Sequence, residues 1–276
     1  MAIRPEETKI LVAIPCYGQV MKTPFVISLM QLTQKLAQHK LNLSVLIIGD
    51  SLIPRARNNF ASVILHDPQY SHLLFLDCDI EFPPAAILHM LDMDKDIIGT
   101  AYTRKNINWI NIAEAAKAGM EAQNLPEVGG NLVAVSHENV PAEYGEPLKV
   151  THVGTGLMLV KRTVFERMRD AYPELKYELG DNEPGKAERK VAWDFFACTI
   201  DPDAHILLSE DYAFCRRASA LGIDTWLLTC HRTVHWGDYG FVFNMNQLGR
   251  VGLQPMDMGA HAKELAKKNG AHDPAK

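Results

Sequence analysis

The sequence is poor in cysteine, and the cysteines that it has are scattered. The chain of 276 residues has five, an odd number without a C-x-x-C pair, at Cys16, Cys78, Cys198, Cys215 and Cys230. Closely spaced cysteine pairs are typical of zinc-binding folds and of small disulfide-bonded secreted domains. Their absence argues against a zinc or disulfide framework and favours a reducing compartment, so we expect a cytoplasmic protein.

Long hydrophobic runs and an excess of positive charge are also missing. No stretch approaches about 18 uninterrupted apolar residues, and the first ten residues carry charges where a signal peptide has its apolar core. Secretion and membrane spanning are therefore not expected. The formal net charge is −5, so the protein has no overall positive field that would hold a polyanion such as a nucleic acid.

Low-complexity tracts, internal repeats and clear linkers are absent as well, which favours one continuous domain over residues 1–276. Hydrophobic residues make up 47% of the chain and charged residues 22%, close to the values of ordered globular proteins. A chain of this length can bury a large core. We divide the expected domain into a first half over residues 9–103, a second half over residues 150–243, and a C-terminal helix and tail over residues 257–276.

What is present is an alternation of short apolar runs with longer segments of helical period. The apolar runs predict strands over residues 9–14, 43–48, 72–76, 96–103, 191–200 and 223–230. Helical spacing predicts helices over residues 24–38, 54–65, 83–91, 162–171 and 209–221. This alternation is typical of an α/β fold with a mostly parallel sheet covered by helices on both faces. Residues 231–243 are expected to form an aromatic loop.

Two carboxylates, Asp77 and Asp79, directly follow the predicted strand over residues 72–76. In open α/β sheets, ligands bind beyond the carboxyl ends of the strands. Paired carboxylates at such a place are hard oxygen donors that can hold Mg²⁺ or Mn²⁺ and leave positions for the phosphates of a substrate. The alternative is an acidic turn that caps the next helix, but two acids directly after a buried strand are costly unless something pairs with them.

Two further segments carry candidate ligand-binding residues. Arg55, Arg57 and Asn58 lie in the first turns of a predicted helix, where guanidinium groups can grip a diphosphate or a sugar by bidentate hydrogen bonds. A solvated helix face would explain one of them but not easily all three. The segment Gly154-Thr155-Gly156 would let the backbone approach a ligand closely because glycine has no side chain, and a β-bulge is the alternative.

The order of these motifs along the chain resembles that of the nucleotide-sugar glycosyltransferases of the GT-A fold, which have a D-x-D motif, and in particular those of family 2. The resemblance implies a Rossmann-like GT-A sheet, with a nucleotide-binding first half and an acceptor and catalytic second half. A D-x-D motif alone occurs by chance in many proteins, so the order of the motifs carries the resemblance. It runs from about residue 9 to residue 240 and rests on Ile14-Pro15-Cys16-Tyr17, Arg55 with Arg57-Asn58, Leu76-Asp77-Cys78-Asp79, Gly154-Thr155-Gly156, Ser209-Glu210-Asp211 and His235.

The resemblance implies a nucleoside-diphosphate sugar as donor. Pro15 and Tyr17 would contact its base and ribose, and Asp77 would bind the ribose or reach the metal through water. The arginine and Gly154-Thr155-Gly156 segments would contact its diphosphate and its sugar. Asp79 would bind Mn²⁺ or Mg²⁺, with His235 as the carboxy-terminal metal ligand and His231 as its alternative. A divalent ion stabilises the charge that develops on a departing nucleoside diphosphate.

The same resemblance implies that Asp211 accepts the proton of an acceptor hydroxyl in an inverting displacement, while Glu210 binds the acceptor or sugar hydroxyls. Stereochemistry stays open, because the family also has retaining members. From the residues alone, there is a structural alternative: carboxylates at a helix N-terminus are also favoured simply by the helix macrodipole and by capping.

Two other classes of protein compete with this interpretation. A nucleotidyltransferase acting on sugar phosphates also uses paired acids and a divalent ion, but it usually has a Gly-rich phosphate loop, and here only Gly18 follows the first strand. A non-catalytic nucleotide- or sugar-binding module could keep the fold without the chemistry. The acceptor could be a glycan, a small molecule or a hydroxylated DNA base. DNA would require a basic rim, for which the candidates are Arg104, Lys105, Arg216, Arg217 and Arg232.

Overall fold

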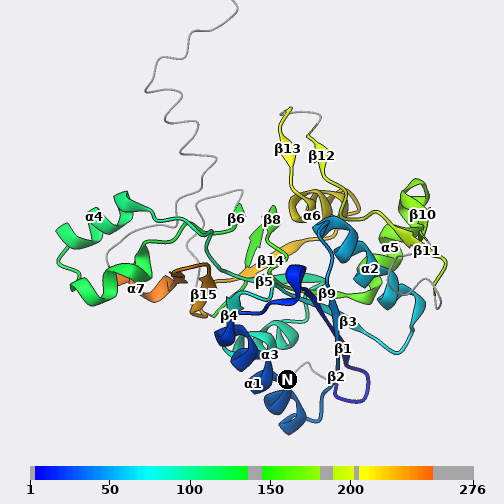
Figure 1. Ribbon diagram of the computed structural model, residues 1–276, viewed down its shortest axis with the longest axis horizontal. Helices are drawn as coiled ribbons and strands as arrows, with labels where there is room; N and C mark the ends of the chain where they lie inside the picture. The colour runs from blue at the N-terminus through cyan, green and yellow to red at the C-terminus, as the bar shows by residue number, and fades with distance from the viewer. Residues whose placement is uncertain (1–3, 136–144, 181–188, 202–204, 251–276) are drawn as a thin grey trace, which may run out of the picture.

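A seven-stranded sheet forms the centre of the protein (Figure 1). The computed structural model describes residues 4–135, 145–180, 189–201 and 205–250. The strands of the central sheet do not follow one another in chain order. Across the sheet they are β2 (Asn42–Ile48), β1 (Lys9–Pro15), β3 (His72–Leu76), β9 (Leu157–Lys161), β5 (Ile97–Thr100), β14 (Thr225–Leu228) and β7 (Leu148–Val150).

Most of these strands point in one direction. Strand β1 pairs in parallel with β2 and β3, and β5 pairs in parallel with β14. Strand β9 is inserted between β3 and β5 and is antiparallel to both, and the edge strand β7 is antiparallel to β14. The predicted α/β class with a mostly parallel central sheet is therefore confirmed, and β9 and β7 are its two reversed strands.

Helices cover both faces of the sheet. One face packs against α1 (Thr23–Gln38) and α3 (Pro84–Asp92), and the other packs against α2 (Ile53–His66), α5 (Arg162–Ala171) and α6 (Glu210–Ala220). Alternate side chains of β1 pack into the cores on the two faces of the sheet, because successive side chains of a strand point to opposite faces. Val12 belongs to the core that contains Phe25 of α1, and Leu11 to the core that contains Phe60 of α2. This is why β1 is apolar at nearly every position.

A smaller sheet beside the main one corrects a prediction made from the sequence. Residues 231–243 were expected to form a loop, but they contain a hairpin of β15 (Thr233–Trp236) and β16 (Gly240–Phe243). Strand β15 also pairs with β4 (Ile80–Glu81), which directly follows the D-x-D motif. The strand partner lies far away in the sequence, so the local pattern could not reveal it.

The strand predicted over residues 191–200 is also wrong as one element. The chain turns after Trp193, where the Ala197 amide donates to the carbonyl of Asp194, and this turn separates β11 (Val191–Trp193) from β12 (Thr199–Ile200). The two strands belong to different two-stranded sheets, β10–β11 and β12–β13. Their partners are β10 (Lys176–Glu178) and β13 (Leu207–Leu208).

The remaining elements are short, and several lie beside the β15–β16 hairpin (Figure 1). The helix and tail expected over residues 257–276 lie outside the described residues. In the described part of the chain, no helix is both long and apolar enough to cross a membrane. The remaining elements are η1 (Tyr17–Gln19), α4 (Trp109–Lys117), η2 (Ala122–Val128), β6 (Ala134–Val135), β8 (His152–Val153), η3 (Pro173–Leu175) and α7 (Met245–Arg250).

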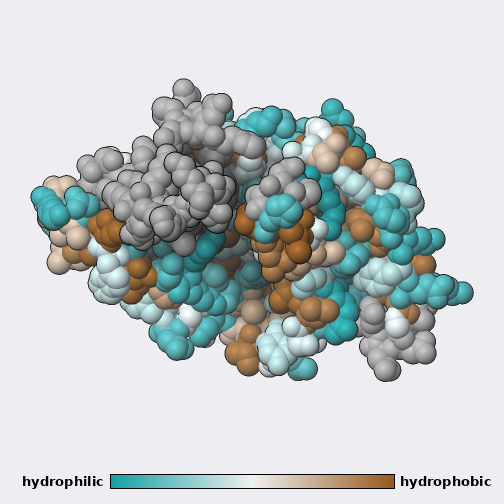
Figure 2. Space-filling view, turned by 90° about the horizontal axis from the view of Figure 1, so that it is seen from above, coloured by the Kyte–Doolittle hydropathy of each residue, from teal (hydrophilic) through white to brown (hydrophobic). Residues whose placement is uncertain are grey.

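The β12–β13 hairpin projects from the body of the protein above α6 (Figure 1). Seen from above, hydrophobic side chains gather near the middle of the molecule, at the position of this hairpin (Figure 2). Ile200, Ile206 and Leu207 are all exposed there. The surface around the hairpin is a mixture of hydrophilic and hydrophobic residues (Figure 2).

Candidate functional site

Most of the predicted site residues meet in one open cleft of about 470 Å³. The cleft lies beyond the carboxyl ends of β1 and β3, which is where ligands bind in open α/β sheets. Segments far apart in the sequence contribute to it, from the turn after β1 to strand β15. The lining residues are Pro15, Tyr17, Val20, Lys22, Ile53, Arg57, Asp77, Cys78, Asp79, Glu210 and His235.

The D-x-D turn is fixed in place by its own backbone. The Asp77 amide donates to the Gly156 carbonyl at 2.9 Å. The carbonyl of Cys78 accepts from the Lys22 amide at 3.0 Å, and the carbonyl of Asp79 accepts from the Trp236 amide at 2.8 Å. The turn is therefore tied to three separate parts of the chain, and both carboxylates are directed by the surrounding fold.

Strand β15 brings His235 to Asp79. Its register places His235 opposite Ile80, and the His235 Nε2 lies 3.3 Å from the Asp79 Oδ1. The other ring nitrogen, Nδ1, lies 2.7 Å from the Thr103 carbonyl oxygen, which can only accept a hydrogen bond. We therefore assign the proton of the neutral imidazole to Nδ1, and this leaves the lone pair of Nε2 directed toward Asp79.

This pair fits a divalent cation. Two adjacent ligands at about 2.1 Å from an octahedral ion lie about 3 Å apart, close to the separation of these two atoms. A protonated Nδ1 held by a carbonyl is the usual arrangement of a metal-binding histidine. The second oxygen of Asp79 pairs with Lys105, whose Nζ lies 2.5 Å away. Burial alone would raise the pKa of Asp79, but its contacts with His235 and Lys105 lower it below its ordinary value. The contact with His235 lowers the pKa only while Nε2 carries a proton, and a bound cation would take the place of that proton.

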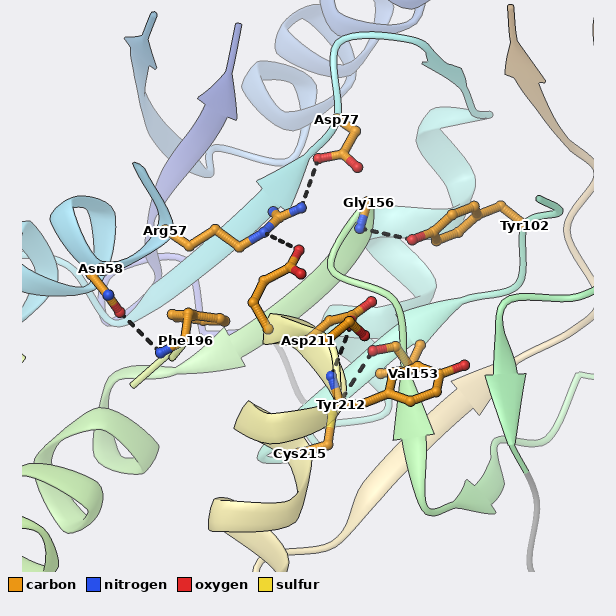
Figure 3. A network of polar contacts seen from close by, with 12 residues as sticks. Arg57, Asn58, Asp77, Tyr102, Val153, Gly156, Phe196, Asp211, Tyr212 and Cys215 are labelled. Atoms are coloured by element: carbon orange, nitrogen blue, oxygen red, sulfur yellow. Dashed lines mark hydrogen bonds and ion pairs between the residues drawn. The ribbon is translucent and has the colours of Figure 1, made fainter. Parts of the chain in front are cut away.

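Arg57 is the buried cation of the cleft. Its side chain is only 4% exposed and bridges two acids, with Nη2 at 3.2 Å from Asp77 and Nε at 3.3 Å from Glu210. Figure 3 shows the guanidinium reaching toward Asp77. Burial would lower the pKa of Arg57, but the two acids raise it above its ordinary value. The third nitrogen, Nη1, is buried and has no hydrogen-bond partner among the described residues.

Arg55 and Asn58 take no part in the bridge that Arg57 forms between Asp77 and Glu210. Arg55 forms a two-bond pair with the buried Asp50, with Nε at 2.7 Å and Nη2 at 2.8 Å from its carboxylate oxygens. Asn58 is buried, donates to Asp194 at 2.6 Å and accepts from the Phe196 amide at 3.0 Å (Figure 3). Neither residue lines the cleft. Donor binding by Arg55 and Asn58 stays a prediction, and their present contacts hold the surrounding segments in place.

The Gly154-Thr155-Gly156 segment contacts Tyr102. A Cβ atom at Gly154 would lie 2.0 Å from the Tyr102 hydroxyl oxygen, and one at Gly156 would lie 2.8 Å from it. The Gly156 amide donates to this hydroxyl at 3.1 Å (Figure 3). Thr155 is buried, and none of the three residues lines the cleft. Packing against Tyr102 thus explains both glycines, and their contact with a donor sugar stays a prediction.

Glu210 and Asp211 form the first turn of α6, as predicted, but only Glu210 is among the residues that line the cleft. Glu210 lines the cleft and holds Arg57. Burial, together with the nearby Asp211, raises the pKa of Glu210 despite the opposing effect of Arg57. Asp211 accepts hydrogen bonds from Ser209 Oγ and from the Tyr212 amide through Oδ1, and its Oδ2 has no hydrogen-bond partner among the described residues.

Three residues near the D-x-D turn were not predicted to belong to the donor or metal site. Lys105 holds Asp79, Lys22 lines the cleft, and Tyr102 lies edge-on to the His235 ring with centroids 5.6 Å apart. Lys105 and Tyr102 follow the carboxyl end of β5, and this position is the signal that would have identified them. The structure also places His231, the alternative ligand, beside His89.

Four of the five basic residues proposed for a DNA-binding rim have partners within the protein. Lys105 pairs with Asp79, Arg216 with Asp201 and Arg232 with Glu127. Arg217 donates to the carbonyls of Phe195 and Ala197. A nucleic acid would have to compete with these contacts for each of the four.

Comparisons with known proteins give weak likenesses. No family model matches the sequence, and no curated protein matches it either. Among solved structures, A197 from STIV is 14% identical with a TM-score of 0.45 over 86% of this chain and 94% of its own. The inositol-1-phosphate CTP transferase from T. maritima is 12% identical with a TM-score of 0.38, over 82% and 86%.

A glycosyltransferase involved in the glycosylation of the major capsid of PBCV-1 is 10% identical, with a TM-score of 0.31 over 60% of this chain and 67% of its own. All three TM-scores are below 0.5, and all three identities are below 25%. The function proposed below therefore rests on the chemistry of the cleft itself.

Proposed function

We propose that this protein is a metal-dependent glycosyltransferase that moves a sugar from a nucleoside-diphosphate donor to a hydroxyl acceptor. The observation that carries the proposal is the composition of the cleft beyond β1 and β3. A carboxylate and an imidazole suited to a divalent ion, Asp79 and His235, share it with the buried Arg57, whose Nη1 lacks a partner among the described residues. Leaving a charged donor unpaired costs free energy, and an anionic oxygen of a ligand would satisfy it.

The charges of the cleft support a metal-bound anion. Asp77, Asp79 and Glu210 are the acids that line it, Lys22 and Arg57 are the cations that line it, and Lys105 pairs with Asp79. A diphosphate alone would therefore meet no excess of positive charge. Asp79 and His235 would hold a Mn²⁺ or Mg²⁺ ion, which would make the cleft positive overall and supply electrostatic stabilisation to a departing diphosphate.

The side chains of the protein then have separate roles. Arg57 binds an anionic oxygen through Nη1, while Asp77 and Glu210 keep its guanidinium fixed. The exposed ring of Tyr17, beside Pro15, offers a stacking surface for the base. Asp211 takes the proton of the acceptor hydroxyl through its unpartnered Oδ2, in an inverting displacement, and Glu210 binds sugar or acceptor hydroxyls.

The test of the donor site is thermal unfolding with a panel of nucleoside diphosphates and diphospho-sugars, each with and without Mn²⁺. A ligand at about one hundred times its Kd adds about 2.7 kcal/mol, which raises Tm by roughly 5 °C in a chain of this size. We expect one base to shift Tm, only with Mn²⁺, and the shift to be lost in Asp79→Asn. The control Glu114→Gln removes an exposed acid of α4 and should keep the full shift.

The test of the chemistry is product analysis with the donor so identified. Glycosyl transfer releases a nucleoside diphosphate, whereas nucleotidyl transfer releases or consumes pyrophosphate. We expect the diphosphate, with a loss of about 10²-fold or more in kcat for Asp211→Asn and an unchanged donor-induced Tm shift. Pyrophosphate chemistry would identify a nucleotidyltransferase, and donor binding without any turnover would identify a binding module.

A further inference from the structure

His89, Cys230 and His231 form a second cluster of metal-binding side chains, outside the cleft. Their ligand atoms all lie within 4.8 Å of one another, and each residue is half-buried. His89 lies in the last turn of α3, and the other two residues lie in the turn between β14 and β15. No role in the proposed glycosyl transfer uses them. Two residues 142 positions apart thus meet through the fold, with the His89 Nδ1 at 3.0 Å from the His231 Nε2.

The distances within the cluster match those of a tetrahedral metal site. Zinc binds histidine nitrogen at about 2.0–2.1 Å and cysteine sulfur at about 2.3 Å, so two ligand nitrogens lie about 3.3 Å apart and a nitrogen and a sulfur about 3.6 Å apart. The two nitrogens lie 3.0 Å apart here, and the Cys230 Sγ lies 3.6 Å from the His89 Nδ1. The imidazole rings are nearly perpendicular, at 83°, with their centroids 5.2 Å apart.

The chemistry of the three donors indicates the class of metal. Two imidazoles and one thiol are softer than the oxygen ligands that Mg²⁺ and Mn²⁺ prefer, and they suit Zn²⁺ or an ion of similar character. The neutral imidazole is the form that binds metal, and each of the two rings presents one nitrogen to the cluster. The exposed Arg232 alongside is paired with Glu127.

We propose that His89, Cys230 and His231 bind a Zn²⁺-class ion, with a fourth position left for water. The ion replaces the hydrogen bond between the two histidines and displaces the thiol proton of Cys230, which passes to solvent. It joins α3 to the turn before β15, and β15 is the strand that carries His235 to Asp79. The lack of C-x-x-C spacing argued against a zinc framework, but these ligands are assembled by the fold from two distant segments.

The experiment is a titration of the full chain with Co²⁺, which reports thiolate ligation by an intense near-ultraviolet charge-transfer band. We expect one equivalent of Co²⁺ to produce the band and one equivalent of Zn²⁺ to abolish it, because zinc binds such sites more tightly. Cys230→Ser should lose the band, and His89→Gln or His231→Gln should weaken Co²⁺ binding at least about tenfold. Cys198→Ser, which alters an exposed cysteine, should behave as wild type.

A second readout separates loss of a ligand from loss of the fold. Without metal, each variant should retain the circular dichroism spectrum of the wild type, and Zn²⁺ should raise Tm of the wild type but not of Cys230→Ser. Asp79→Asn should keep the Co²⁺ band, so failure of the proposed glycosyltransferase site leaves this result intact. Absence of the band in the wild type, or its survival in folded Cys230→Ser, would overturn the proposal.

Discussion

At the scale of single residues, Arg57 is a charge held inside the protein by two acids. It is almost completely buried, it contacts two partly buried acids, and its Nη1 is buried without a hydrogen-bond partner among the described residues. A buried charge of this kind is stable only while its partners are present, because removal of one partner leaves the others uncompensated. The residue therefore serves both the fold and the ligand, and the two roles can be separated by experiment.

We predict that Arg57→Gln lowers the free energy of unfolding by about 3 kcal/mol, because Asp77 and Glu210 lose their cation in a largely buried place. Arg57→Lys keeps the charge but lacks the fork that bridges both acids, so it should lose less stability and still lose nucleotide binding. Urea unfolding and nucleotide-induced Tm shifts measure the two effects. Full nucleotide binding in Arg57→Lys would contradict the assignment of Nη1 to the ligand.

At the scale of elements, the turn between β8 and β9 has little room for additional atoms. Gly154 packs so closely on Tyr102 that any side chain must displace its ring. The same turn supplies the carbonyl that holds the Asp77 amide. A substitution that shifts this turn should therefore also shift the D-x-D motif, through the hydrogen bond between Gly156 and Asp77.

We predict that Gly154→Ala lowers the free energy of unfolding by about 1–3 kcal/mol through overpacking. Tyr102→Phe removes the hydroxyl that the new methyl group would meet, so the double variant should be at least about 0.5 kcal/mol more stable than the sum of the single variants predicts. The control Gly249→Ala adds a methyl group in open space and should change little. Urea unfolding of the set measures the coupling, and strict additivity would exclude the steric explanation.

Strand β3 contributes a pH dependence of stability through His72. Burial lowers the pKa of this histidine to about 4, from 6.5, and Lys161 adds to the effect against the opposing pull of Asp94. As the pH falls below 6.5, the unfolded chain takes up a proton that the folded chain takes up only near pH 4. Stability is therefore lost across this window and is unaffected above it.

We predict a loss from His72 of up to about 3 kcal/mol between pH 6.5 and pH 4, since each unit of pKa shift corresponds to about 1.4 kcal/mol. In His72→Gln the free energy of unfolding should fall less steeply over this range. Urea unfolding at several pH values, with chelator present, measures the slope. His39→Gln, at the end of α1, is the control and should keep the wild-type slope; an identical slope in His72→Gln would contradict the prediction.

At the scale of the whole molecule, the two halves of the sequence are interleaved in one sheet. Strand β9, from the second half, lies between β3 and β5 of the first half, and β14 pairs with the other edge of β5. Without β9, nothing connects β5 to β3. The first half of the chain thus lacks a continuous sheet of its own.

We predict that residues 1–103 alone do not fold, and that the full chain unfolds in one cooperative transition. The fragment would expose apolar residues of β3 and β5 that are fully buried in the intact protein, such as Phe75 and Ile98. Amide dispersion in an NMR spectrum and cooperativity in urea measure the outcome. A well-dispersed spectrum of the fragment with a cooperative transition would show that the halves are separate domains.

The sequence by itself determined the elements whose signals are local. The segments over residues 72–76 and 162–171 carry the complete periodic patterns of β3 and α5, so their predicted bounds agree with the observed ones. Prolines marked the starts of α1, α2 and α3, because proline suits the first turn of a helix. The position of Asp77 and Asp79 after a buried strand placed them at the ligand-binding edge of the sheet.

Only the tertiary structure decided which of several similar residues belong to the site. Arg55 and Arg57 lie two positions apart on one helix, yet one pairs with Asp50 while the other is buried between Asp77 and Glu210. His231 and His235 lie in one segment, but the pairing of β15 with β4 brings only His235 to Asp79, and α3 brings His89 to His231. Local patterns fix which residues form a helix or strand, whereas pairing between distant segments decides which side chains meet.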